Sequence, residues 1–423
     1  MRKLACAVVL VAGCSSSDSG SGHGGAGTLV YAERDSHVIR ILDLAASSDR
    51  LIDDGAFGSV SIAPDAAHVA YVGADRVVKV ADRAGTVTPL EPRSGCNGGT
   101  ANWVTSGAIV YCIDTPQQRG SMLLPALGSS ARFFETPPIV SADGAQVAYV
   151  DAKGNLVLEH ADGSNPRVLV PSEDPSALFS YRYATMFTPD QQHVIMEDTA
   201  DYPPRTRIVP LDGGASIDVE DAHFGGTGFV TMVGGGSVFS PDGSEVAMSS
   251  TTGLVVVNLA TGAKRMLAEY PPRVSSGGAV FLDDGRVAWL RYEDTSVGDL
   301  GDFKLGIDVA GPGANEDFAI IEPRDEWWST IAISPSGFVA VPSEALLVST
   351  DGTVLVPNDT SSESAFHADI VGISADGTGV ITSSSTGEIR FVGLNGRVRH
   401  LANASRSTGD LWPPSVAFTP AAL

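Results

Sequence analysis

Short apolar runs that end in a polar turn recur along the chain. In FSPDGSEVAMSS, from Phe239, an apolar segment meets a Pro-Asp-Gly turn, and a second segment of alternating pattern follows. Proline presets φ at the first turn position and glycine tolerates a positive φ, so this stretch predicts a β-hairpin. Related stretches begin at Ile62, Trp103, Val140, Phe187, Phe281, Ile333 and Ile373. Their return along the chain predicts a repeated unit made of strands.

One unit shows four strands clearly. From Pro138 onward, PIVSA, QVAYVD, NLVLEHA and RVLVP alternate or run apolar, with turns at Asp143-Gly144 and Asp162-Gly163. The units recur at roughly 45-residue intervals, which is typical of propeller blades, and no helical period is present. The sequence therefore predicts an all-β fold, a single β-propeller of four-stranded blades.

The two ends of the chain complete this prediction. Residues 29–52 supply three strands of a unit without its first strand, and SVAFTP, from Ser415, supplies a first strand without successors. Pairing the N- and C-terminal strands would close the ring and remove exposed sheet edges. Eight internal units and the shared one give nine blades. Because one unit could be an elaborated loop, eight or nine blades are expected, and seven stays open.

The repeated hairpins carry a resemblance to a known family. FSPDGSEVA, ISADGTGVI, VSADGAQVA and FTPDQQHVI resemble the WD40-like (PD40) repeats of the TolB-type propellers. This resemblance implies a propeller over nearly the whole mature chain. It implies little about activity, since the architecture hosts scaffolds, peptidase domains and lyases. Neither the α/β domain of TolB nor the hydrolase domain of the related peptidases is expected here.

The N-terminus has the layout of a secretory signal. MRKLACAVVLVAGC combines two basic residues, a short apolar run and small residues before Cys14. The segment from Val11 to Cys14 resembles the lipobox of bacterial lipoproteins, which implies lipidation of Cys14. An ordinary signal peptide beside a cysteine is the alternative. The predicted domains are a signal peptide at 1–13, the lipidated cysteine with a Gly/Ser tether at 14–27, and the propeller at 28–423.

The net charge and the expected cellular location limit the classes of partner that the protein could bind. The formal net charge is −23, which repels phosphate backbones and anionic headgroups, so nucleic acid is not expected as a partner. Contact with the membrane is expected through the lipid anchor only. By resemblance to enterobacterial lipoproteins, Ser15 after the lipidated position implies the outer membrane, and either its periplasmic or its surface side is left open. A monomer is expected.

In an exported protein Cys96 and Cys112 are candidates for a disulfide, with two free thiols as the alternative.

One face of the predicted propeller carries the longer, aromatic loops. Function tends to sit on long loops held by a rigid scaffold, and aromatic side chains are typical anchors of binding patches. The candidate binding residues are Tyr181, Tyr183, Tyr202, Tyr270, Trp327, Trp328 and Trp412. The alternative is that these rings wedge between blades as part of the core.

No specific catalytic motif is present. The chain has no Walker loop, HExxH, nucleophile elbow or CxxC pair, so no catalytic residue is assigned. Three histidines in predicted loops of the aromatic face each lie two positions from an aspartate and could hold a divalent metal. They are His37, His223 and His367, near Asp35, Asp221 and Asp369. Solvated loop histidines are the alternative.

Aspartates form two further groups. Asp294, Asp299 and Asp302 share a loop with glycines that could bind calcium, although its spacing is not that of an EF-hand. The aspartates of the repeated turns are interpreted as turn residues whose carboxylates accept backbone N–H bonds. These are Asp65, Asp143, Asp190, Asp242 and Asp376.

Two functions follow as hypotheses. The first is a lipid-anchored, non-enzymatic propeller of the cell envelope that binds a protein or peptide through its long-loop face and needs no cofactor. The alternative is a metal-dependent polysaccharide lyase or hydrolase on the same scaffold, with His37, His223 and His367 as first ligands.

Overall fold

The protein is described by a computed structural model whose strands and turns cover most of the predicted repeats. The described residues are 27–33, 38–43, 48–53, 56–73, 75–90, 101–105, 107–115, 118–172, 182–198, 205–220, 222–223, 238–250, 252–271, 274–294, 303–311, 314–321, 332–333, 338–341, 346–349, 354–356, 369–373, 379–383, 388–395, 397–403 and 416–420. Within these ranges all regular structure is β-strand, and every pair of neighbouring strands is antiparallel.

The strands of the described residues form nine four-stranded sheets, numbered 1 to 9 here in chain order. Sheet 1 consists of β36 (Val416–Pro420), β1 (Gly27–Glu33), β2 (Val38–Asp43) and β3 (Ser48–Asp53). Sheet 2 consists of β4 (Ala56–Ile62), β5 (His68–Gly73), β6 (Val78–Asp82) and β7 (Val87–Pro89). Sheet 3 consists of β8 (Ala101–Trp103), β9 (Ile109–Asp114), β10 (Arg119–Leu124) and β11 (Arg132–Phe134).

Sheets 4 to 6 follow the same order. Sheet 4 consists of β12 (Ile139–Val140), β13 (Gln146–Val150), β14 (Leu156–His160) and β15 (Arg167–Val170). Sheet 5 consists of β16 (Arg182–Phe187), β17 (His193–Asp198), β18 (Arg205–Pro210) and β19 (Ile217–Glu220). Sheet 6 consists of β20 (Ala222–His223), β21 (Glu245–Ser250), β22 (Gly253–Asn258) and β23 (Lys264–Glu269).

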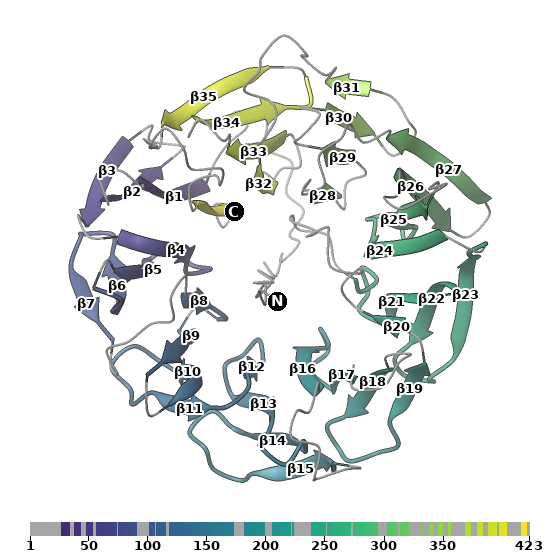
Figure 1. The fold of residues 1–423 in the computed structure, drawn as a ribbon, viewed down its shortest axis with the longest axis horizontal. Coiled ribbons are helices and arrows are strands. Elements are labelled where there is room, and N and C mark those ends of the chain that lie inside the picture. Colours follow the sequence, from purple (N-terminus) through teal and green to yellow (C-terminus); the bar gives the residue numbers. More distant parts are fainter. Residues whose placement is uncertain are drawn as a thin grey trace.

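The last three sheets complete the set. Sheet 7 consists of β24 (Val274–Phe281), β25 (Val287–Asp294), β26 (Phe303–Gly311) and β27 (Ala314–Ile321). Sheet 8 consists of β28 (Ala332–Ile333), β29 (Phe338–Val341), β30 (Leu346–Ser349) and β31 (Val354–Val356). Sheet 9 consists of β32 (Asp369–Ile373), β33 (Gly379–Ser383), β34 (Glu388–Gly393) and β35 (Val398–Asn403). Figure 1 shows the sheets arranged around a common centre, with the first strand of each unit innermost.

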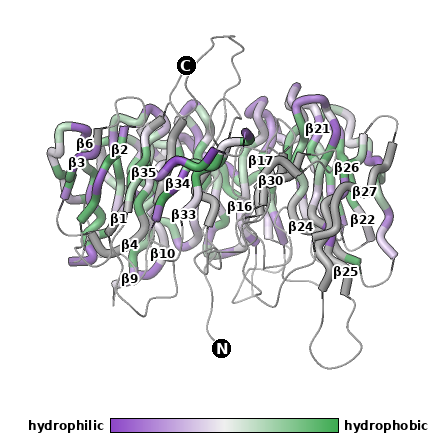
Figure 2. Tube along the Cα trace, turned by 90° about the horizontal axis from the view of Figure 1, so that it is seen from above, coloured by the Kyte–Doolittle hydropathy of each residue, from purple (hydrophilic) through white to green (hydrophobic). Residues whose placement is uncertain are grey.

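Apolar side chains on both faces of the sheets explain this stacking. One buried cluster joins sheets 4 and 5 through Leu158 and Met196, and the next joins sheets 5 and 6 through Ile208 and Val255. Because side chains alternate between faces along a strand, a strand buried on both faces packs against two neighbouring sheets. Figure 2 shows hydrophobic stretches within many of the strands, as this packing requires.

Strands from the two ends of the described chain lie in one sheet. In sheet 1, β1 pairs with β36 in antiparallel register, with Leu29 opposite Phe418 and Tyr31 opposite Val416. Figure 1 shows β36 beside β1 on its inner side. The strand pairing expected between the chain ends is therefore present, and it supplies sheet 1 with its innermost strand.

The repeated turns are built as the sequence predicts. In sheet 4 the Ser141 hydroxyl donates to Asp143 at 2.6 Å, and the Asp143 carboxylate accepts the backbone N–H of Ala145 at 2.9 Å. The structural interpretation of the turn aspartates is confirmed for Asp65, Asp143, Asp190 and Asp242, which each accept a backbone N–H two residues on. Asp376 lies outside the described residues.

The first strand of sheet 6 differs from the prediction. The sequence placed His223 in a loop and the end of an apolar strand at Phe239, but Ala222 and His223 form β20 and pair with Ser250 and Ser249. Phe239 pairs with the same strand, β21, through a bridge to Val246. Two separate stretches of chain therefore share the inner edge of β21. The prediction missed β20 because two residues carry too little alternation to be recognised.

Candidate functional site

The two ends of the sheets carry different connections. At one end, called the turn end, lie the hairpins between first and second strands and between third and fourth strands. At the other, called the loop end, lie the connections between second and third strands and those between consecutive sheets. Among the predicted aromatic residues, the two that the structure describes, Tyr183 and Tyr270, belong to the loop end.

Tyr183 lies at the loop end, in a strand rather than in the predicted loop. It is the second residue of β16, and its side chain is 40% exposed. Its hydroxyl donates a hydrogen bond to Glu197, the residue opposite it in β17, which is only 5% exposed. Burial, together with the negative charge of Glu197, raises the pKa of Tyr183 above its usual value. Tyr183 is therefore a neutral hydrogen-bond donor held at a fixed position.

The neighbouring residues form an ion pair. Arg182 and Asp198 lie opposite each other next to Tyr183 and Glu197, and the Arg182 guanidinium bonds to the Asp198 carboxylate. Both side chains are largely buried. The roles of Glu197, Arg182 and Asp198 could not be predicted from the sequence, because their pairing depends on the register between two strands. The one sequence signal for this pairing is that β16 begins with the polar pair Arg182-Tyr183 and β17 ends with the polar pair Glu197-Asp198.

A row of paired residues crosses sheet 5 from Tyr183 outward. Glu197 pairs with Thr206 in β18, and Thr206 pairs with Val219 in the outermost strand, β19. The buried Thr206 hydroxyl donates to the backbone carbonyl of Ala222, in sheet 6, at 2.6 Å. The row thus lies on the face of sheet 5 that packs against sheet 6, and its outer end opens into a cavity.

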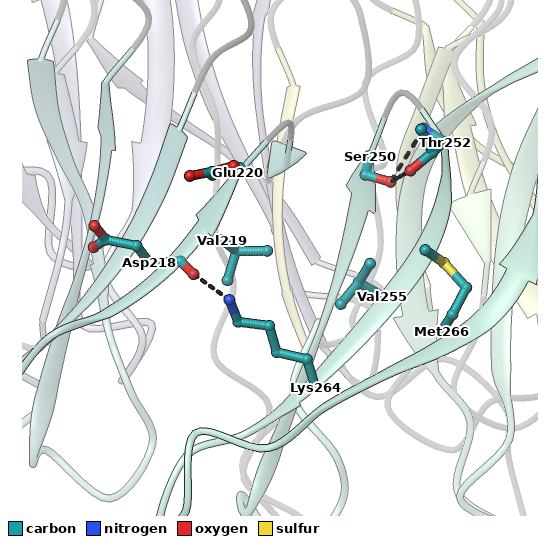
Figure 3. A pocket seen from close by; sticks show the side chains of 8 residues that line it. All are labelled: Asp218, Val219, Glu220, Ser250, Thr252, Val255, Lys264 and Met266. Carbon is teal, nitrogen blue, oxygen red and sulfur yellow. Dashed lines mark hydrogen bonds between the residues drawn. The ribbon is translucent and has the colours of Figure 1, made fainter.

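This cavity lies between sheets 5 and 6 and has a volume of about 330 Å³. Its lining residues are Asp218, Val219, Glu220, Ser250, Thr252, Val255, Lys264 and Met266. Figure 3 shows the Lys264 ammonium bonded to the backbone carbonyl of Asp218, while the Asp218 carboxylate points away from it. That carboxylate pairs with Arg207 on the other face of sheet 5, at 2.7 Å. We call this space the 5/6 cavity.

Tyr270 has a different environment. Its half-buried ring packs against the apolar cluster between sheets 6 and 7, which includes Leu254 and Phe281. Its backbone N–H donates to the Thr252 carbonyl at 2.9 Å. Tyr270 therefore fits the alternative that some of the loop aromatics wedge between sheets.

Most of the other candidate residues lie outside the described part of the chain. These are Cys14, Cys96, Tyr181, Tyr202, Trp327, Trp328, Trp412, His37, His367, Asp35, Asp221, Asp299 and Asp302. Cys112 is disulfide-bonded, and its pairing with Cys96 stays a prediction.

The metal candidates are described only in part. Asp294 and Asp369 were predicted in loops but belong to β25 and β32, and His223 belongs to β20; the backbone alone is described for all three. Within the described residues there is no cluster of three or more histidine, cysteine, aspartate or glutamate side chains that could hold a metal ion. The same residues include no helix long and apolar enough to cross a membrane.

Comparison with known proteins supports the fold class. No family model and no curated protein matches the chain. Among solved structures, dihydro-heme d1 dehydrogenase NirN in complex with DHE is similar, at 17% identity, 94% coverage of this chain, 75% coverage of that chain and a TM-score of 0.50. This likeness concerns the fold alone.

Two further structures are more distant. A putative TolB from Agrobacterium tumefaciens shares 14% identity over 79% of this chain and 97% of its own, with a TM-score of 0.31. Oligogalacturonate lyase in complex with manganese shares 14% identity over 65% of this chain and 83% of its own, with a TM-score of 0.34. Neither is close enough to decide between binding and catalysis. The chain is an all-β protein of four-stranded antiparallel sheets, of the β-propeller class.

Proposed function

We propose that the chain is a closed nine-bladed propeller of PD40-type repeats that acts as a non-enzymatic scaffold in the cell envelope. Support for the closed ring comes from the pairing of β1 with β36 and from the arrangement of the sheets around one centre. Each four-stranded sheet is then one blade. A monomer with neither cofactor nor metal is the form in which we expect it to act.

The scaffold binds a protein or peptide at the loop end. The observation that carries this proposal is Tyr183, an exposed aromatic side chain whose hydroxyl is held by the buried Glu197. An aromatic ring fixed in advance loses little conformational entropy when a partner covers it, and this is a common property of binding anchors. Tyr181, Tyr202, Trp327, Trp328 and Trp412 would extend the same surface.

The proposed cellular location rests on the N-terminal sequence. The layout of MRKLACAVVLVAGC supports cleavage before Cys14 and lipidation of its thiol, and Ser15 supports the outer membrane. Radiolabelled palmitate should enter the wild-type protein and should not enter Cys14→Ser. Labelling of Cys14→Ser, or none in the wild type, would show that the anchor is wrongly assigned.

A capture experiment tests the scaffold function. Purified wild-type protein is used to capture partners from solubilised envelopes, beside Tyr183→Ala, the double variant Trp327→Ala/Trp328→Ala, and Gln192→Ala as a turn-end control. We expect a specific partner to be retained by the wild type and Gln192→Ala and lost by the loop-end variants. Partner retention by every variant would contradict the proposal. A stoichiometric divalent metal that is lost in His223→Ala would instead favour a metal-dependent lyase or hydrolase.

A further inference from the structure

The 5/6 cavity has the size and mixed lining of a small ligand site. Its volume of about 330 Å³ lies near the lower end of the range for such sites, about 300 to 1,000 Å³. It lies at the outer part of the contact between two sheets, at the far end of the residue row that begins at Tyr183. A ligand here would be separate from a partner on the loop end.

Lys264 gives the cavity a positive charge at one end. Its ammonium group has three N–H donors, and the backbone carbonyl of Asp218 accepts one of them. The lining holds two acidic residues, Asp218 and Glu220, and the Asp218 carboxylate is turned away and pairs with Arg207. Within the described residues no carboxylate is paired with Lys264, so an anionic group of a ligand would be its first partner of opposite charge.

The middle of the cavity is apolar. Val219 and Val255 line it from the two facing sheets, and Met266 adds a flexible thioether side chain that is 45% exposed. An exposed methionine on a strand can adapt to the shape of an aliphatic group. This part of the lining fits an aliphatic side chain of a ligand.

One wall of the cavity is the edge of a sheet. β19 is the outermost strand of sheet 5, and the Asp218 carbonyl on its outer edge already bonds to a group in the neighbouring sheet. In an antiparallel strand the N–H and C=O of one residue point to the same side, and residues two apart repeat that direction. Asp218 and Glu220 therefore present backbone groups toward the cavity, as a strand-like ligand requires.

We propose that the 5/6 cavity binds the C-terminal end of an extended peptide whose last side chain is aliphatic. The terminal carboxylate pairs with Lys264, the last side chain packs on Met266 and Val255, and the peptide backbone pairs with the edge of β19. Since Lys264 lies toward the turn end and Glu220 toward the loop end, such a peptide runs antiparallel to β19. Ser250 and Thr252 then face its preceding residues.

Methyl NMR tests this assignment directly. The full chain is labelled with methyl-¹³C methionine, and the Met266 signal is identified by its loss in Met266→Leu. The peptide Ala-Ala-Leu is titrated as the free acid and as its C-terminal amide. We expect the free acid to shift the Met266 signal saturably and the amide to bind roughly tenfold more weakly or not at all, because a charge-assisted bond is lost.

Variants of Lys264 give the second arm of the test. Lys264→Gln should weaken binding of the free acid about tenfold, whereas Lys264→Arg should keep most of it. Lys153→Gln, in the exposed connection between β13 and β14, is the matched control and should bind as the wild type does. Circular dichroism and thermal unfolding check that each variant is folded.

Three results would overturn the proposal. The first is equal binding of acid and amide, and the second is unchanged binding by Lys264→Gln. The third is an unperturbed Met266 signal at millimolar peptide, with or without shifts at other methionines. The proposed scaffold function would survive all three, since its partner binds at the loop end.

Discussion

Sheet 5 holds two fully buried threonines, one near each end, and their hydroxyls bond in different ways. At the turn end the Thr188 hydroxyl donates to Asp190 at 2.6 Å and accepts the backbone N–H of His193 at 3.0 Å, so its bonds stay within one hairpin. At the loop end the Thr206 hydroxyl donates to the Ala222 carbonyl of sheet 6. The Thr188 hydroxyl is therefore satisfied within its own sheet, whereas the Thr206 hydroxyl depends on the neighbouring sheet.

Carboxylates at the two ends bond to different kinds of group. At the turn end the carboxylates of Asp143 and Asp242 accept bonds from their own hairpins, which lower the pKa of both groups. At the loop end Glu197 holds the hydroxyl of an exposed tyrosine. Polar groups that close a turn contribute to stability, whereas a polar pair that fixes an exposed ring suits the recognition proposed for the loop end.

The largest effect on stability is expected at the turn end. Thr188→Val keeps the side-chain volume but removes the donor to Asp190 and the acceptor for the His193 N–H. Loss of two bonds at a buried position should lower the free energy of unfolding by about 2 to 3 kcal/mol, measured by urea denaturation. Partner capture should not change. A loss below the experimental error would contradict the role given to the repeated turn.

Thr206→Val should have a smaller effect. It removes one bond and leaves the Ala222 carbonyl without that donor, so we expect a loss of about 1 to 2 kcal/mol. Faster amide hydrogen exchange should appear in β20 and spare the hairpin between β16 and β17. If Thr206→Val cost more than Thr188→Val, the expectation that two lost bonds within a hairpin outweigh one lost bond between sheets would be wrong.

Much of the fold could be predicted from the sequence because its signals are local. Alternating apolar residues predict the strands, and Pro-Asp-Gly turns predict the hairpins, including the variant in which Gln191 takes a positive φ of 56° without glycine. Because the N-terminal unit lacks a first strand, the sequence also predicted that a C-terminal strand, now seen as β36, would supply it. The pairing of Tyr183 with Glu197 could not be predicted, because it depends on strand register, and the 5/6 cavity depends on how two sheets stack.

The smallest effect concerns acid stability. Hydrogen bonds from the Ser240 hydroxyl and from Ser244 lower the pKa of Asp242 from 3.8 to about 2. A carboxylate with a lowered pKa in the folded state contributes stability above its ordinary pKa and loses it as the pH falls through about 2. Asp242→Asn should therefore be slightly less stable than the wild type at pH 5, with the difference shrinking toward pH 2. Because Asp242 is exposed, the effect is small. A difference that grows with acidity would have the wrong sign.

Site-specific photo-crosslinking measures most directly whether the loop end is the recognition surface. A photoreactive phenylalanine replaces Tyr183 in one variant and Gln192, in a hairpin of the same sheet at the turn end, in another, and each is irradiated in intact cells. We expect a discrete crosslinked partner from position 183 and none from position 192. Crosslinks from position 192 alone, or the same partner from both positions, would contradict this expectation.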